Sequence, residues 1–163
     1  MIAAAQDVVI ERLPEGFGRW QELLDLILGS FAYMDGVIDP PSSALRLTPQ
    51  ALADKTRGEV CFLAARGEDL VGCVFAAERK DAFYLGKLAV DPAEQGRGIG
   101  SRLIEAVEKH AMECGKPVLE LETRVELAGN HAAFRRMGFV EVGRNAHAGF
   151  DRPTSITFRK RLA

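Results

Sequence analysis

The chain has 163 residues, of which 47% are hydrophobic and 27% charged, and its formal net charge is −2. This length suits one domain with its own core, so we predict a single domain over residues 1–163. The slightly acidic charge argues against a nucleic-acid partner, and no apolar run approaches the length that spans a membrane. The three cysteines lack metal-ligand spacing and the first residues lack a signal-peptide pattern, so we expect no metal and a cytoplasmic location.

Hydrophobic periodicity and turn residues predict alternating strands and helices along the chain. Strands are expected at 8–10, 60–65, 70–77, 83–90, 118–123, 139–142 and 155–159. Helices are expected at 19–29, from Pro49 after the N-cap Thr48 to 54, from about 101 to the stop at Gly115 and Pro117, and from Asn130, as N-cap, to Gly138. The second and third strands form a hairpin. The pattern therefore predicts an α/β fold with about seven strands and about four helices.

The glycine-rich turn Gln95-Gly96-Arg97-Gly98-Ile99-Gly100 is the most informative segment, because it joins a predicted strand to a predicted helix. Free backbone N–H groups and the positive end of the helix dipole make such a turn an anion site. Glycine leaves no Cβ between the backbone and a phosphate, and Arg97 and Arg102 add cationic donors. The spacing excludes a P-loop, since no Lys follows Gly100, and it differs from the Gly-x-Gly-x-x-Gly fingerprint of dinucleotide sites. A turn without a ligand is the alternative.

Gln95-x-x-Gly98-x-Gly100 matches the Gln/Arg-x-x-Gly-x-Gly/Ala motif of the GCN5-related N-acetyltransferase (GNAT) superfamily. The preceding Leu88-Ala89-Val90-Asp91-Pro92 resembles the fourth strand of that family and its exit, and residues 130–139 are similar to its short helix ending in Gly-Phe. The two matches cover residues 83–140. The resemblance implies a mixed, largely antiparallel central sheet with helices on both faces, and acetyl-CoA as co-substrate.

The resemblance also implies which residues bind acetyl-CoA. The amides of the turn would wrap the pyrophosphate, and the exposed edge of the fourth strand, splayed from its neighbour, would pair with the pantetheine arm. The Leu88 amide would then bind the thioester oxygen as it becomes an oxyanion. Asn130 and Phe134 would line the far side of the arm, with a plain helix cap and core packing as the alternatives. The expected cofactor-binding residues are Leu88, Ala89, Val90, Gln95, Gly96, Arg97, Gly98, Ile99, Gly100, Ser101, Asn130 and Phe134.

The side chains that would move protons depart from the pattern of the family. Many members carry a Tyr four residues before the Gly-Phe pair as the acid for the leaving thiolate, where this chain has Phe134. Histone-type members carry a Glu four residues before the position of Leu88, where this chain has Tyr84. The candidates for acid and base are therefore Tyr84, Glu78, Glu122 and His147, each of which also has a purely structural interpretation. Ordered water in place of a dedicated base stays open.

The sequence does not identify the acceptor of the acetyl group. The first helix, the loop after it and the last strands should build its pocket from Phe31, Tyr33, Met34, Asp35 and residues 40–43. Asp35 and Asp39 would attract a cationic amine there, or are solvated loop acids.

Two classes of function follow from the resemblance. The first is an N-acetyltransferase that moves acetyl from acetyl-CoA to a primary amine, in a small molecule or a peptide, by direct attack on the thioester. The second is a non-catalytic acyl-CoA sensor on the same fold, which the Phe at position 134 keeps open. A homodimer is plausible from the habit of the family.

Overall fold

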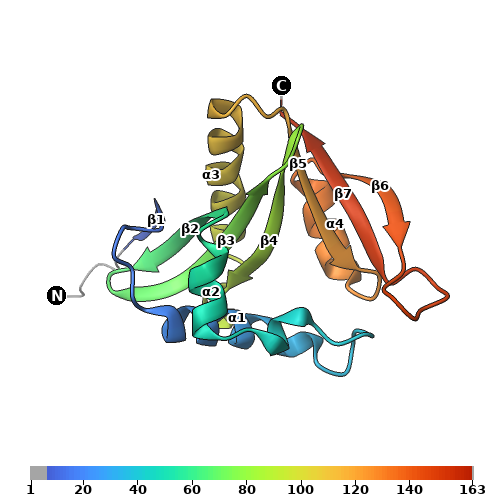
Figure 1. Ribbon diagram of the computed structural model, residues 1–163, viewed down its shortest axis with the longest axis horizontal. Helices are drawn as coiled ribbons and strands as arrows, with labels where there is room; N and C mark the ends of the chain where they lie inside the picture. Colours follow the sequence, from blue (N-terminus) through green and yellow to red (C-terminus); the bar gives the residue numbers. More distant parts are fainter. Residues whose placement is uncertain (1–6, 163) are drawn as a thin grey trace.

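The computed structural model describes residues 7–162, and its strands form one seven-stranded sheet in the order β1-β2-β3-β4-β5-β7-β6 (Figure 1). The strands are β1 (Val8–Arg12), β2 (Glu59–Arg66), β3 (Asp69–Glu78), β4 (Ala82–Val90), β5 (Val118–Arg124), β6 (Val140–Asn145) and β7 (Ser155–Arg161). Every neighbouring pair is antiparallel except β4 and β5, which are parallel. The predicted mixed, largely antiparallel sheet is confirmed.

Four α-helices accompany the sheet in the described part of the chain: α1 (Trp20–Phe31), α2 (Pro49–Lys55), α3 (Ile99–Glu113) and α4 (Ala128–Arg136). Three short 3₁₀ helices, η1 (Ala32–Met34), η2 (Ser43–Arg46) and η3 (Pro92–Glu94), were not predicted. No helix among residues 7–162 is long and apolar enough to cross a bilayer.

Local signals placed most element ends correctly. The Thr48 hydroxyl accepts the Ala51 N–H at 3.0 Å, so the predicted N-cap of α2 is confirmed. The predicted cap of α4 was wrong: this helix begins after Leu127, without a capping side chain, and Asn130 lies in its first turn. Leu127 is buried in a small cluster with Met34, so tertiary packing rather than a polar cap sets this helix start.

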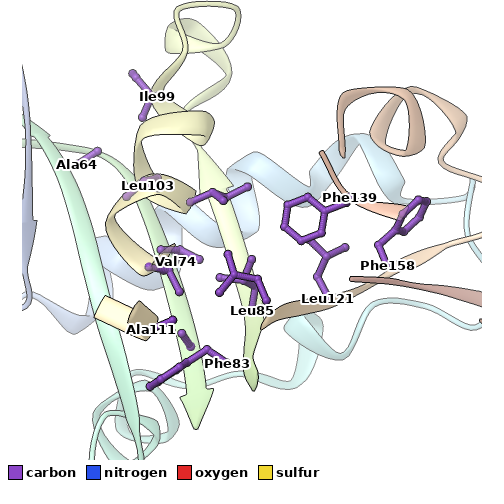
Figure 2. Packing of buried hydrophobic residues seen from close by; sticks show 14 of the residues in the cluster. Ala64, Val74, Phe83, Leu85, Ile99, Leu103, Ala111, Leu121, Phe139 and Phe158 are labelled. Carbon is purple, nitrogen blue, oxygen red and sulfur yellow. The ribbon is translucent and has the colours of Figure 1, made fainter. Parts of the chain in front are cut away.

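The sheet has helices on both faces, because successive strand residues point to opposite sides. On one face Leu103 and Val107 of α3 pack in a cluster with Val74, Leu85 and Leu121 of the sheet (Figure 2). On the other face α1 and α2 cover a second cluster of buried side chains, which includes Leu23, Ile27, Leu52, Cys61, Leu63, Cys73 and Phe75. Full burial of each large apolar side chain stabilises the fold by about 1.5–3 kcal/mol relative to exposure.

The parallel ladder between β4 and β5 is short. It runs from Ala82 opposite Val118 to Leu85 opposite Leu121, and the strands then diverge (Figure 1). The buried pair Leu85 and Leu121 closes the point of divergence on the α3 face, near Phe139 (Figure 2). Residues 86–90 of β4 therefore have no strand partner on the side of β5, which is the splayed geometry expected from the resemblance.

Candidate active site

The glycine-rich turn lies between the unpaired half of β4 and the first turn of α3. Gly96 and Gly98 have φ of 80° and 78°, a conformation that side chains with a Cβ rarely adopt. Apart from the adjacent residues of the chain, nothing among residues 7–162 lies within 4 Å of the place a Cβ would take at either glycine. Gly98 is also the N-cap of α3 and offers no side-chain cap, so the first amides of this 15-residue helix remain donors for an anion. The turn thus fits a pyrophosphate.

Charged and polar side chains fix the turn on the sheet. Glu94 accepts from the Arg66 guanidinium at 2.7 Å and lies 3.4 Å from that of Arg97. The hydrogen bond from Arg66 lowers the pKa of the Glu94 carboxyl. The Gln95 side chain donates to the Val90 carbonyl at 3.3 Å, so it ties the turn to the end of β4.

The unpaired half of β4 directs the backbone N–H groups of Val90 and Leu88 toward the space where β4 and β5 diverge. Asp91 N–H donates to Val71 on β3 at 2.8 Å, whereas the next amide back, that of Val90, donates to the buried Ser30 hydroxyl of α1 at 3.2 Å. Since N–H directions alternate along a strand, the Leu88 amide also faces away from β3. Val90, expected to pair with pantetheine, already has internal partners for both its N–H and its carbonyl.

Lys87 interrupts β4 just before Leu88. The register passes from Gly86 opposite Phe75 to Ala89 opposite Cys73, which leaves a bulge, and Lys87 has φ of 50°. It is the one residue with a side chain that has a positive φ among residues 7–162. Bulges re-aim side chains next to functional sites, and this one lies where the Leu88 amide faces the divergence.

Two of the catalytic candidates come together across the ladder. Tyr84 on β4 lies beside Glu122 on β5, and the Arg79 guanidinium stacks on its ring at 4.5 Å from the centroid. Burial, followed by the charge of Glu122, raises the pKa of Tyr84 to about 12. Tyr84 therefore keeps its proton at neutral pH and is a donor. Glu122 itself is exposed.

The other two candidates lie elsewhere. Glu78 stands opposite Phe83, at the end of β4 farthest from the glycine turn, with its carboxylate 3.8 Å from Lys116 Nζ. His147 donates its backbone N–H to the buried Thr154 hydroxyl at 2.8 Å, and its Nδ1 contacts the same hydroxyl. These bonds hold the loop between β6 and β7. The structure brings neither residue to Tyr84 or to the Leu88 amide.

The two residues expected along the pantetheine arm have different environments. The Asn130 amide donates to the Tyr33 hydroxyl at 3.1 Å, which joins α4 to η1. Phe134, one turn later on α4, packs edge-on against Phe139 with ring centroids 5.9 Å apart and also lies near Phe158. Phe134 is half-buried and packs against the core. Tyr33, which is 54% exposed, places a phenol beside α4.

The loop after η1 is fastened to the end of β5. Arg124 donates to the carbonyls of Pro40 and Pro41 at 2.6 and 3.2 Å, and Glu126 accepts the Asp39 N–H at 2.9 Å. The Asp39 carboxylate lies 3.6 Å from Arg152, so it already has a cationic partner. The loop is therefore positioned by contacts with the β5–α4 connection.

The remaining acceptor candidates divide by burial. Met34 packs with Ile38, Leu127 and Phe31, so it belongs to a small core and not to an open surface. Asp35 is exposed and ends η1 through its backbone N–H.

Sequence reasoning missed three basic residues, Arg46, Lys87 and Arg124, which we call the cation group. They come from η2, β4 and β5, and the separation along the chain hides that the charges of Arg46 and Arg124 act on Lys87. One signal was available, since Lys87 is the only charged residue in the otherwise apolar β4.

A splayed parallel pair of strands that leads into a glycine turn at a helix N-terminus defines the class of site, which is one open to an anionic ligand. The chain belongs to the acetyltransferase (GNAT) family, whose model matches residues 20–139. It is 32% identical over 160 residues to an IAA acetyltransferase from Azospirillum brasilense, which spans 96% of this chain and 92% of that protein. It is also 32% identical over 93 residues to the N-alpha-acetyltransferase MAK3 from Arabidopsis thaliana, over 55% of this chain and 49% of that protein.

A solved structure shows the same fold at low identity. PaiA N-acetyltransferase from Thermoplasma acidophilum, determined in complex with coenzyme A, matches with a TM-score of 0.77 at 14% identity, over 96% of this chain and 99% of that one. The resemblance drawn from the glycine turn and from residues 130–139 is thereby confirmed at the level of family and fold.

Proposed function

We propose that the protein is an N-acetyltransferase that transfers the acetyl group of acetyl-CoA to a primary amine. The observation that carries the proposal is the continuity of two features: the open glycine turn at the start of α3 and the unpaired half of β4 that leads into it. The names of the relatives support acetyl transfer, and the solved relative with coenzyme A supports the choice of donor.

Acetyl-CoA supplies an acetyl group activated as a thioester. The amides of residues 95–101 would bind its pyrophosphate, and the β4 edge would align the pantetheine arm. The Leu88 amide would donate to the carbonyl oxygen as negative charge develops there, an interaction worth roughly 10²–10³ in rate where such donors have been removed from other enzymes. These contributions come from the main chain, so they tolerate the unusual side chains of this site.

The reaction needs two proton movements. The amine nitrogen forms a bond to the carbonyl carbon and gives up a proton, while the C–S bond breaks and the thiolate takes one. An alkylamine with a pKa near 10.4 is neutral only about one part in a thousand at pH 7, so removal of its proton matters. Tyr84, kept protonated by burial, is our candidate donor to the thiolate, and the exposed Glu122 beside it is our candidate base. Tyr33 is the second candidate donor.

The test is release of free thiol from acetyl-CoA with a panel of amines, amino acids and short peptides. Turnover with one class of acceptor, lost in Gly98→Asp, would establish the enzyme and its substrate class. Binding of acetyl-CoA in calorimetry with no turnover across the panel would favour the non-catalytic sensor, because Phe134 offers no proton. Absence of any acetyl-CoA binding would overturn the assignment of the glycine turn.

A further inference from the structure

We infer that the acceptor carries a carboxylate, and that Arg46, Lys87 and Arg124 hold it beside the unpaired half of β4. The inference rests on the proposed function for the reaction, but it concerns a different set of residues from the glycine turn. It specifies the acceptor class that the sequence left open.

One segment brings the three basic residues into one region, in which Arg46 is exposed and its charge acts on Lys87. Lys87 Nζ donates to the Ser43 hydroxyl at 2.9 Å, and Ser43 is the first residue of η2, which ends at Arg46. The Arg124 guanidinium binds the carbonyls of Pro40 and Pro41, just before η2. The segment 40–46 therefore bridges the bulge of β4 and the end of β5, on the side where these two strands diverge.

The charges of this group are not balanced within the described part of the protein. None of the three forms an ion pair with a carboxylate there. Nearby Lys55 pairs with Glu59 at 2.7 Å. Of the acids near Arg124, Asp39 lies against Arg152 and Glu126 accepts the Asp39 amide, although both still act on the Arg124 charge.

Partial burial makes this imbalance costly. Lys87 is half-buried, and burial followed by the charge of Lys55 lowers its pKa; Glu59 acts in the opposite direction, and Arg124 and Arg46 lower the pKa by less. Moving a cation out of water without a counter-charge costs free energy, and a bound anion would offset that cost. A carboxylate matches this need, since it accepts two hydrogen bonds from Arg and one from the Lys ammonium.

The position of Lys87 connects the anion to the chemistry. It immediately precedes Leu88, whose amide is the proposed oxyanion donor, and its positive φ is a conformation that a Lys adopts only where the surroundings enforce it. A carboxylate at Lys87 would therefore place an amine a few bonds away close to the thioester. The glycine turn beyond the end of β4 would bind the phosphates of the donor. The cation group is therefore not needed for the donor and can bind the acceptor.

Matched acceptors test the inference. We would compare an amino acid, its primary amide and its decarboxylated amine, and peptides with Glu, Gln or Lys at the second position. We expect kcat/KM for the carboxylates to exceed that for the amides at least about tenfold, with a KM that rises as salt is added. The two series separate a free amino acid from an acidic peptide as the source of the carboxylate.

Two variants assign the effect to the residues. In Lys87→Met and Arg46→Gln we expect the preference for carboxylates to shrink at least about fivefold, while the Kd of acetyl-CoA stays within twofold. Arg57→Gln is the matched control, because Arg57 lies on the surface after α2 and is 79% exposed beside Asp54. Equal kcat/KM for carboxylate and amide in the unmodified protein, or an equal loss for both in the variants, would overturn the inference.

A binding measurement separates this inference from the proposed function. Calorimetry in the presence of coenzyme A would compare an N-acetylated amino acid with its amide, which requires no turnover. Binding of the carboxylate form alone, weakened in Lys87→Met, supports the cation group even if no acceptor is acetylated. Binding of neither form, with coenzyme A bound, would count against the cation group and leave the glycine turn untouched.

Discussion

The glycine turn and the cation group lie at two ends of the unpaired half of β4, and they are built in different ways. The turn is six consecutive residues whose chemistry is carried by the main chain. The cation group takes one side chain each from η2, β4 and β5, and its geometry depends on a loop held by Arg124. The difference suggests a division of labour, in which a contiguous motif recognises the common donor and dispersed side chains select the particular acceptor.

We expect the largest effect on ligand affinity from Gly98→Asp, which tests the proposed role of the glycine turn in binding the donor. We expect acetyl-CoA affinity to fall at least about 100-fold, because a carboxylate would project where the pyrophosphate binds. The measurement is calorimetric titration with acetyl-CoA.

Gly115→Asp provides the matched control at the other end of α3. Gly98 and Gly115 have φ of 78° and 72°, and in the described part of the chain a Cβ at either would meet nothing within 4 Å beyond the adjacent residues. Both variants should lose stability by about 1 kcal/mol from the left-handed backbone, but only the first should lose affinity. Equal affinity losses would show that global strain, and not the turn, is responsible.

The next effect should be on kcat in the tyrosine variants. If Tyr84 protonates the leaving thiolate, Tyr84→Phe should lower kcat by about 10- to 100-fold with an unchanged Kd for acetyl-CoA. Tyr33→Phe removes the partner of Asn130 and provides the comparison. A larger loss in Tyr33→Phe would move the donor to the α4 side of the site. Full activity in both Tyr→Phe variants would show that neither Tyr is needed and that water protonates the leaving thiolate.

An alkaline titration should give a moderate effect on stability. Because burial raises the pKa of Tyr84 from 10.0 to about 12, the folded state retains the phenolic proton longer than the unfolded state does. The stabilising effect is therefore complete below pH 10 and is lost as pH rises toward 12. We expect the free energy of unfolding to fall in that window, and to fall less in Tyr84→Phe. Tyrosinate absorbance in the two single-Tyr variants would assign the transition, as the chain has two Tyr residues.

The smallest effect should come from Glu94→Gln, which loosens the support of the glycine turn. We expect acetyl-CoA affinity to fall only about two- to fivefold, since partly exposed ion pairs contribute little. The lowered pKa of Glu94 means that its stabilising contribution is present above its ordinary value of 4.5 and is lost as pH falls through the lowered one. Urea unfolding between pH 6 and pH 3 should show a shallower decline in the variant. Asp54→Asn, at a remote surface pair, is the control.

Local physics made most of the fold predictable. The Thr48 hydroxyl caps the start of α2, as its position before Pro49 predicts. In β5, apolar and charged residues alternate, so the buried Leu residues lie on one face and Glu120 and Glu122 on the other. The end of α3 follows from Gly115, which takes the left-handed conformation after the last turn. The start of α4 could not be predicted, because it depends on Leu127 packing against residues about ninety positions earlier in the chain.

In the candidate site, too, the features set by consecutive residues were predictable, and the contacts between distant residues were not. The glycine turn at the start of α3 was predictable as a local structure, because its glycines and the helix start are consecutive in sequence. The partner of Asn130 was not, since Tyr33 lies 97 residues away. Lys87 stood out as a charge in an apolar strand, but its positive φ and its neighbours Arg46 and Arg124 emerge only from the bulge and the folded loop.

The short ladder between β4 and β5 has a consequence for the lifetime of the protein. Only four residue pairs join β4 to β5 and so connect the two parts of the sheet. An acyl donor bound between the diverging ends of these strands would add contacts along the part of β4 that has no strand partner there. Ligand that binds only the folded state, at 100 times its Kd, adds about 2.7 kcal/mol to stability. If acetyl-CoA is that ligand, resistance of the protein to proteolysis should rise with the concentration of acetyl-CoA.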